Sequence, residues 1–359
     1  MIVVFTSNTN GAMTQMSIHL LKEFTEMGID SVCFLPQQAT VTVPVNLESK
    51  LCTYNKVRTM NRHSRSIIKI CEKIKGVSPD LIVYVDNGIV SSVVALSLVG
   101  YTKQIMTFHD AGAYHPSNHT SLKDRLHTFI EHKISRSAAN KITNVMVMSR
   151  ESEQNFKRYY PESAEKTILV PLGAHIPDAD ETAPEEHIPQ DYFLFFGRID
   201  KYKGISDLLE AYSGLNNKDI HLVIAGKGSL SEKEQELCKE NNVILLNRYI
   251  SDGEMKWLFK HSKFLILPYI QATQSGIIPI AYSYGIPVIT SNVPGLTQFV
   301  QNGKTGFICS NIEDYKLKIE QMWNMNLKEM SEYCTKYYSL HLDWKANLRN
   351  LLNAMEILR

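Results

Sequence analysis

The chain has 359 residues, 44% of them hydrophobic, which is enough to bury two separate cores, so two domains are expected. The net charge of +1 argues against a nucleic-acid binder that relies on a positive field. Six scattered cysteines without a CxxC pair indicate neither a zinc site nor a disulfide framework, and no stretch approaches a membrane span or a signal peptide. A cytoplasmic protein is expected, with at most a peripheral membrane contact.

The first half begins with a β-α-β pattern. Ile2–Thr6 predicts a buried strand, the polar turn Ser7–Gly11 follows, and an amphipathic helix leads to a second strand at Ser31–Leu35. This opening resembles a Rossmann unit, but its turn has one glycine where a dinucleotide motif needs three, so a nicotinamide cofactor is not expected. Backbone N–H groups around Gly11 are a candidate ligand contact; alternatively, Gly11 only satisfies the turn.

Residues 56–75 form the most basic segment, with seven Lys or Arg residues and one acid. If the whole segment were helical, spacings of three or four would place several cations on one face: Arg58, Arg62, Arg65, Lys69 and Lys73. Such a stripe is suited to an anionic membrane surface or an acidic acceptor. The competing interpretation is a solvated helix face packed on a sheet.

The rest of the first half continues the alternation and ends in a linker. A strand at Gln104–Phe108 ends at His109 and Asp110, where a parallel sheet binds ligands, so His109 is a candidate for contact with a sugar hydroxyl. A purely structural histidine is the alternative. Further elements are expected at Leu81–Val85, Leu122–Lys141, Asn144–Met148 and Thr167–Pro171. Residues 176–190, with three prolines and five acids, have the composition of a linker, whose Asp178 and Asp180 are better explained by solvated charge than by a metal site.

The second half opens with the segment YFLFFGRIDKYKGISDLLEAY. Its apolar run Tyr192–Phe196 predicts a buried strand that stops at Gly197, and a helical pattern resumes from Ser206. Arg198 and Lys203 lie in the intervening turn, at the carboxyl end of the strand. A guanidinium fork and a mobile ammonium together are suited to hold a diphosphate and stabilise it as a leaving group. Two solvated surface cations are the alternative.

A second polar loop lies further along this half, in PYIQATQSGIIPIAYSYGIPVIT. Thr273, Gln274 and Ser275 precede a small apolar helix at Gly276–Tyr284, with Ser275 as the expected N-cap, and this helix terminus is a candidate anion site. Strands flank the loop and precede it, and the final helices are expected to cross back to the first domain. The expected strands are His221–Ala225, Val243–Leu246, Phe264–Leu267 and Pro287–Thr290.

Four ordered motifs carry a resemblance to a known family: FGRIDKYKGISDLLEAY, LVIAGKGSL, the block that contains TQSGIIPIAYSYG, and VPGLTQFVQNGKTGFI. They resemble the nucleotide-sugar half of the retaining glycosyltransferases of family 4, also called glycosyl transferases group 1. The resemblance implies the GT-B architecture, an α/β fold of two Rossmann-like doubly wound domains that face a cleft. It places the acceptor domain at residues 1–175 with a C-terminal helix at about 341–359, the linker at 176–190, and the nucleotide-sugar domain at 191–340.

The resemblance also implies roles for particular residues. Arg198 and Lys203 match the pair that binds the donor diphosphate, and His109 matches a histidine beside the transferred sugar. The remaining candidate donor contacts lie in the glycine turns, in the segment that would meet the nucleoside base, and in the polar loop. They are Gly11, Gly197, Arg248, Tyr249, Ile250, Gln271, Thr273, Gln274, Ser275 and Gly276. Two glutamates that the family carries around this loop are absent, with Ile280 and Ala272 or Gln271 in their places, and Gln298 stands where an acid often occurs.

The function implied is transfer of a sugar from a UDP- or GDP-sugar to a glycan or lipid-linked acceptor. Retention of configuration, no metal, and a role in surface polysaccharide synthesis at the inner face of the membrane are expected. No cofactor besides the donor substrate and no nucleic-acid partner are expected. Two alternatives stay open: a catalytically weakened protein that acts as a binding partner, for which the missing glutamates argue, and a sugar-nucleotide epimerase, which needs acid and base groups beyond His109 and Asp110.

Overall fold

The computed structural model describes residues 1–57, 59–109, 122–174, 176 and 179–357. The chain forms two compact units. The first comprises Met1–Pro171 together with Trp344–Arg359, and the second comprises Leu172–Asp343. The C-terminal helix is therefore part of the first unit, and residues 176–190 are counted with the second unit.

The first unit is built on a parallel sheet of seven strands in the order β3-β2-β1-β4-β5-β6-β7. Ile2 of β1 pairs with Ser31 on one side and with Leu81 on the other, so the winding direction of the chain reverses between β1 and β4. The strands are β1 (Ile2–Phe5), β2 (Ser31–Pro36), β3 (Leu51–Tyr54), β4 (Leu81–Tyr84), β5 (Lys103–Thr107), β6 (Asn144–Val147) and β7 (Thr167–Leu169).

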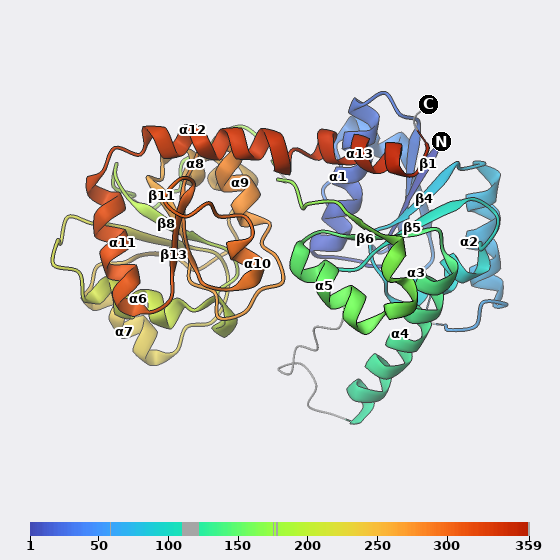
Figure 1. The fold of residues 1–359 in the computed structure, drawn as a ribbon, viewed down its shortest axis with the longest axis horizontal. Helices are drawn as coiled ribbons and strands as arrows, with labels where there is room; N and C mark the ends of the chain where they lie inside the picture. Colours follow the sequence, from blue (N-terminus) through green and yellow to red (C-terminus); the bar gives the residue numbers. More distant parts are fainter. Residues whose placement is uncertain (58, 110–121, 175, 177–178, 358–359) are drawn as a thin grey trace. The chain divides into compact units, whose positions relative to one another are not determined.

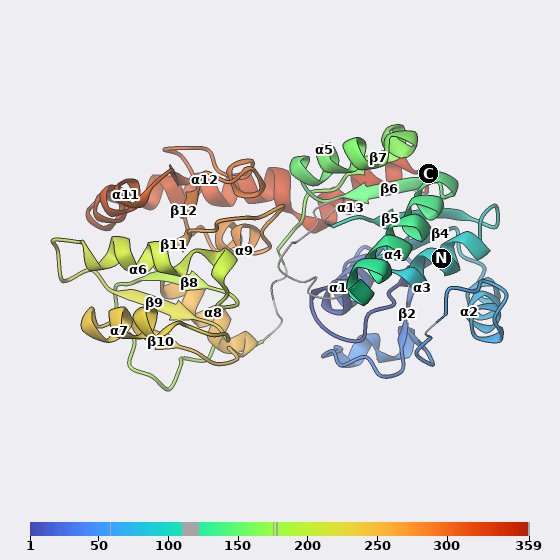
Figure 2. The ribbon, with the colours of Figure 1, turned by 90° about the horizontal axis from the view of Figure 1, so that it is seen from below.

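Helices cover both faces of this sheet (Figure 1 and Figure 2), so its strands are apolar on both sides and buried. The α-helices of the unit are α1 (Ala12–Glu26), α2 (Arg65–Gly76), α3 (Ile89–Ser97), α4 (Leu122–Lys141), α5 (Arg150–Tyr159) and α13 (Trp344–Ala354). Short 3-10 turns lie at Val45–Lys50 and Pro161–Lys166. Helix α13 is tied to its unit by a Lys345–Glu26 ion pair of 2.6 Å and by the Asn347 amide, which donates to the carbonyl of Pro171.

The second unit repeats the plan with six parallel strands in the order β10-β9-β8-β11-β12-β13, and here the reversal lies between β8 and β11. The strands are β8 (Phe193–Phe196), β9 (Leu222–Ala225), β10 (Ile244–Leu246), β11 (Phe264–Leu267), β12 (Val288–Ser291) and β13 (Gly306–Cys309). The helices are α6 (Ile205–Ser213), α7 (Glu232–Glu240), α8 (Asp252–His261), α9 (Ile277–Ser283), α10 (Pro294–Thr297), α11 (Ile312–Asn324) and α12 (Lys328–Tyr337). A 3-10 turn at Lys201–Lys203 and a π-helical turn at Tyr338–Leu342 complete it.

The expected α/β fold of two doubly wound sheets is confirmed, and every expected strand is present within two residues of its expected ends. β3, a short edge strand, was not expected. In an open parallel sheet, ligands bind outside the carboxyl ends of the strands where the winding reverses. Each unit therefore has one such position, between β1 and β4 and between β8 and β11.

The prediction of one cationic stripe along residues 56–75 is wrong. Helix α2 begins at Arg65, because the Ser64 side chain caps it by accepting from the N–H of Ile67. Arg62 lies in the polar turn before the helix, and Arg58 lies outside the described residues. The remaining cationic face of α2 consists of Arg65, Lys69 and Lys73, all exposed.

Candidate functional site

The backbone of the β8–α6 loop is held tightly against the loop after β9. The N–H of Gly197 donates to the carbonyl of Ala225 over 3.0 Å, and the N–H of Ile199 donates to Lys227 over 3.1 Å. A Cβ on Gly226 would lie 1.9 Å from the carbonyl oxygen of Gly197, so only glycine fits there. The two loops thus extend the parallel ladder past the strand ends and fix the backbone that carries Arg198.

These loops and the segment after β10 line a pocket of about 770 Å³. It lies at the carboxyl end of the sheet, next to the reversal point at β8. Among the expected donor contacts, four line it together with Arg198: Gly197, Arg248, Tyr249 and Ile250. The remaining lining residues are Phe196, Ile199, Asp200, Lys201 and Gly226–Ser229.

Arg198 projects from this loop with a side chain that is 67% exposed. One terminal nitrogen donates to the hydroxyl of Tyr202 over 3.2 Å, and Nε lies 3.8 Å from a carboxylate oxygen of Asp200. This hydrogen bond to the Tyr202 oxygen raises the pKa of Arg198 above its ordinary value. The guanidinium is therefore charged and oriented, and much of its donor edge faces solvent.

Lys203 ends the 3-10 turn after Arg198 and is half-buried. Its Nζ lies 3.6 Å from the centroid of the Tyr269 ring and 4.9 Å from that of Tyr202, so it is enclosed between two aromatic faces. Burial is the main reason that its pKa falls from 10.5 to about 7; the nearby Arg198 charge lowers it further and Asp200 opposes the change. Among the described residues no carboxylate forms an ion pair with this ammonium, and a bound anion would supply one.

Two contacts bring the β11–α9 loop to Lys203. The N–H of Ile270 donates to the carbonyl of Tyr202 over 2.8 Å, and Gly204 lies so close to Pro268 that a Cβ would be 1.8 Å from the Pro268 oxygen. The first and third sequence motifs therefore meet at the β8–β11 reversal point. The polar loop that follows carries the other expected contacts: Gln271, Thr273, Gln274, Ser275 and Gly276.

Ser275 does not cap α9 as expected. The N-cap is Gly276, and the buried Ser275 hydroxyl instead accepts from the N–H of Ile277 over 3.3 Å. Helix α9 has only seven residues, so the expected anion site at its N-terminus has little helix dipole behind it. Ile280, at the position of one absent family glutamate, is a buried core residue.

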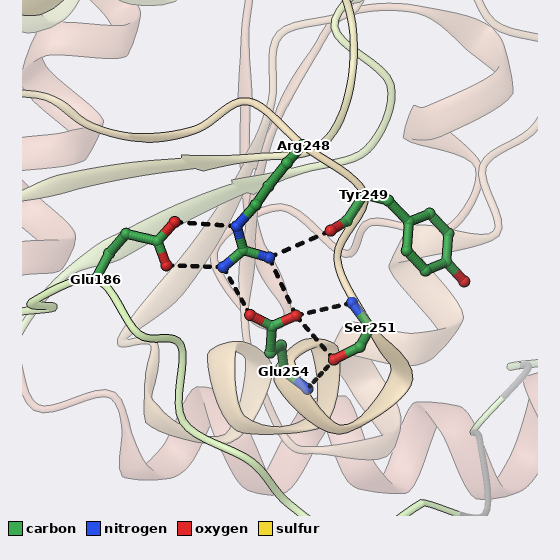
Figure 3. Close-up of polar contacts among 5 residues, drawn as sticks. All are labelled: Glu186, Arg248, Tyr249, Ser251 and Glu254. Carbon is green, nitrogen blue, oxygen red and sulfur yellow. Dashed lines mark hydrogen bonds and ion pairs between the residues drawn. The ribbon is translucent and has the colours of Figure 1, made fainter.

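Arg248 is held by two carboxylates (Figure 3). Its Nε and one terminal nitrogen donate to Glu186 over 3.0 and 2.7 Å, and its terminal nitrogens donate to Glu254 over 3.1 and 2.6 Å. Glu254 also accepts from Ser251 in a capping box at the start of α8. The Arg248 hydrogen bond lowers the pKa of Glu254 to about 2. Arg248 thus fastens Glu186 to α8, whereas the side chain of Tyr249 is turned away and 72% exposed.

His109 lies in the first unit, at the carboxyl end of β5. Its Nε2 is 2.9 Å from the carbonyl oxygen of Val85, and because a carbonyl only accepts, Nε2 carries a proton. Gly11 is the exposed N-cap of α1 and has a φ of 79°, a conformation that favours glycine. Asp110 and Asp178 lie outside the described residues.

Three acidic side chains near these positions were not among the candidate residues predicted from the sequence. Asp86 follows β4, is buried, and shares a pocket with His109. The motif LIVYVDNG places an acid at the end of an apolar run, and this signal could have identified it. No such signal marked Glu186 and Glu254, because their role is to pair with Arg248 and this pairing depends on the folded structure. Among the described residues, no three His, Cys, Asp or Glu side chains gather as a metal-binding group, and no helix is both long and apolar enough to cross a bilayer.

Comparison with known proteins supports the resemblance. Residues 179–340 match the family model "Glycosyl transferases group 1". The capsular polysaccharide biosynthesis glycosyltransferase CapM of Staphylococcus aureus is 28% identical over 139 residues, 36% of this chain and 36% of CapM. The O-antigen chain mannosyltransferase C of Escherichia coli is 22% identical over 185 residues, 48% of each chain. The matched segment thus spans less than half the length of these curated relatives.

Solved structures share the fold over the whole chain. The Anabaena protein Alr3699/HepE in complex with UDP superposes with a TM-score of 0.74 at 14% identity, covering 99% of this chain and 100% of that one. WaaG, a glycosyltransferase involved in lipopolysaccharide biosynthesis, has a TM-score of 0.67 at 14% identity and covers 99% of both chains. The chain has the GT-B fold of these structures, and its residues 179–340 are similar to the family model of the glycosyl transferases group 1.

Proposed function

We propose that this protein is a retaining, metal-independent glycosyltransferase that moves a hexose from a UDP- or GDP-sugar to a glycan or lipid-linked acceptor in surface polysaccharide synthesis. The observation that carries the proposal is that Arg198 and Lys203 lie together in the loop after β8, next to the β8–β11 reversal point. Both cations lie within 6 Å of the same Tyr202 ring, at 5.8 and 4.9 Å. Arg198 and Lys203 would bind the donor diphosphate and stabilise it as it leaves.

The remaining parts of the site fit the same donor. The adjacent pocket of about 770 Å³ would take the nucleoside, with the exposed Tyr249 ring as a surface for the base. Gln271 and Gln274 would offer amide groups to sugar hydroxyls in place of the absent glutamates. The names of CapM and of mannosyltransferase C support a role in polysaccharide assembly.

The proposal predicts that the protein binds and slowly hydrolyses a nucleotide sugar. A thermal-shift panel of UDP, GDP, UDP-glucose and GDP-mannose should raise the melting temperature for one base, since a ligand at ~100 times its Kd adds roughly 2.7 kcal/mol. Release of nucleoside diphosphate from the matching sugar would then be followed. Binding without release over days would favour a catalytically weakened partner. Isomerisation of the sugar without an acceptor would favour an epimerase, and no binding of any of the four would end the proposal.

We propose in addition that the α2 face meets an anionic membrane. Arg65, Lys69 and Lys73 are exposed there beside Ile68, which is 43% exposed. Co-sedimentation with vesicles of phosphatidylglycerol should exceed that with phosphatidylcholine and fall at high salt. A triple Lys/Arg→Gln variant of this face that still sediments equally would contradict the assignment.

A further inference from the structure

Tyr202 contacts both cations of the proposed diphosphate site. It is the middle residue of the 3-10 turn Lys201–Lys203, and its side chain is half-buried. Its hydroxyl accepts from a terminal nitrogen of Arg198 over 3.2 Å, and the guanidinium carbon of Arg198 lies 5.8 Å from the centroid of its ring. The same ring centroid lies 4.9 Å from Nζ of Lys203. One side chain therefore engages a guanidinium through its hydroxyl and an ammonium through its ring.

The backbone around Tyr202 is anchored to the loop after β11. The N–H of Ile270 donates to the carbonyl of Tyr202 over 2.8 Å. Gly204 follows the turn with a φ of 67°, and a Cβ at this position would lie 1.8 Å from the carbonyl oxygen of Pro268. Because these contacts are made by backbone atoms, they do not depend on the identity of the Tyr202 side chain. The side chain can therefore be changed while the turn keeps its main support.

The ring of Tyr202 is itself supported by Tyr269. The two ring centroids lie 6.5 Å apart with an angle of 69° between the ring planes, which is an edge-to-face arrangement. Tyr269 is buried, with 1% of its surface exposed, and its ring centroid lies 3.6 Å from Nζ of Lys203. A buried ring has little freedom to move, so its contact restrains the more exposed ring of Tyr202. Tyr202 is therefore held in position before any ligand binds.

Arg198 needs such an anchor because its side chain is largely exposed. An unrestrained arginine side chain populates many rotamers, and fixing one of them on a bound anion costs conformational entropy. The hydrogen bond to Tyr202 restricts these rotamers in advance, which lowers that cost. A diphosphate presents two phosphate groups at a nearly fixed separation. It therefore gains most from two cations whose separation is also fixed.

We propose that Tyr202 is a positioning residue of the donor site, which holds Arg198 through its hydroxyl and Lys203 through its ring so that both cations meet the same diphosphate. This inference rests on the proposed transferase function and adds a residue to it. Because Tyr202 sets the placement of one cation relative to the other, its loss should weaken the binding of a diphosphate more than that of a monophosphate. A role in stability alone would weaken both equally.

The test compares the affinities of UDP and UMP for the full chain by calorimetry, or of GDP and GMP if guanine is preferred. Tyr202→Phe removes the hydroxyl and keeps the ring, and the ratio of diphosphate to monophosphate affinity should fall about fivefold, the size of one hydrogen bond. Tyr202→Leu also removes the ring, so the ratio should fall at least about tenfold as the cation–π contact is lost. An unchanged ratio in Tyr202→Phe, or no further fall in Tyr202→Leu, would overturn the inference.

Tyr333→Phe and Tyr333→Leu are the matched controls. Tyr333 lies on α12 of the same unit, its ring centroid is 5.9 Å from Nζ of Lys304, and it is not among the residues that line the pocket beside Arg198. Both variants should keep the wild-type ratio, and an equal fall there would count against the inference.

Pyrophosphate and phosphate give the same comparison without a nucleoside, which separates the inference from the proposed function. If wild type prefers pyrophosphate, and this preference falls in the Tyr202 variants while no nucleotide sugar binds, the proposed function fails and the role of Tyr202 stands. If a nucleotide sugar is bound and cleaved while the Tyr202 variants keep the wild-type ratio, the inference fails and the proposed function stands.

Discussion

The half-buried ammonium of Lys203 leads to a measurable proton linkage. Its pKa of about 7 means that in the free protein it is charged about half of the time at pH 7 and about one-tenth of the time at pH 8. A unit negative charge at ~4 Å favours the charged form by about 4 kcal/mol at an effective dielectric constant of 20, or roughly three pKa units. A bound diphosphate should therefore keep Lys203 charged throughout this range.

Donor binding should consequently take up about 0.5 proton per molecule at pH 7 and about 0.9 at pH 8. Isothermal titration calorimetry measures this uptake as the slope of the observed enthalpy against the ionisation enthalpy of the buffer. UDP-glucose, or the GDP-sugar if that base is preferred, is a suitable probe, because its phosphodiester groups do not titrate in this range. Titrations in phosphate, HEPES and Tris at each pH would supply the slope.

Lys203→Arg is the control, because a guanidinium stays charged at both pH values. This variant should bind the donor without taking up a proton, so its observed enthalpy should not depend on the ionisation enthalpy of the buffer. Two results would refute the reasoning: a wild-type slope near zero at pH 8, or an equal slope in Lys203→Arg. Either would mean that Lys203 does not meet the diphosphate or that its ammonium is already charged in the free protein.

Further predictions concern catalysis and stability. Arg198→Ala, with folding intact, should lower turnover of the nucleotide sugar about 10²-fold, and unchanged turnover would count against leaving-group stabilisation. Because folding lowers the Lys203 pKa, the unfolded chain binds more protons than the folded protein between pH 7 and 10.5. The free energy of unfolding should therefore rise with pH in this range, by at most about 1.4 kcal/mol per pH unit. Urea titrations of a Lys203→Met variant should show a smaller rise with pH, and an equal rise would contradict this. Arg248→Met should cost about 1–3 kcal/mol in chemical denaturation, more than Lys260→Met, which removes only a solvent-exposed pair with Glu181; equal losses would refute the clamp. Asp86→Ala should cost about 3 kcal/mol, since it strands several donors at the floor of the first unit's pocket, and a melting temperature like that of wild type would show that those loops do not depend on it.

Much of the fold was predictable because it depends on local signals. Short apolar runs bounded by glycines and polar turns mark buried parallel strands, and the strand at Phe193–Phe196 with its Gly197 break is the clearest case. The edge strand β3 was missed because Leu51–Tyr54 is short and only partly apolar. The prediction of a cationic stripe at residues 56–75 was wrong because a spacing rule assumes a continuous helix. Ser64 instead caps α2, which begins nine residues after the start of this segment.

The sequence by itself determined the alternation of strands and helices, the two-unit plan, and the cations Arg198 and Lys203 at a strand end. Tertiary structure decided what those groups experience. Burial beside the Tyr202 and Tyr269 rings lowers the Lys203 pKa, and two carboxylates engage Arg248. Together with the convergence of Asp86, Ser7 and Glu131 around Gly88, these contacts join residues up to 124 positions apart, from Ser7 to Glu131. Hydrophobic periodicity is a local property of the chain, whereas a pKa, a clamp or a pocket depends on distances that only the packed fold sets.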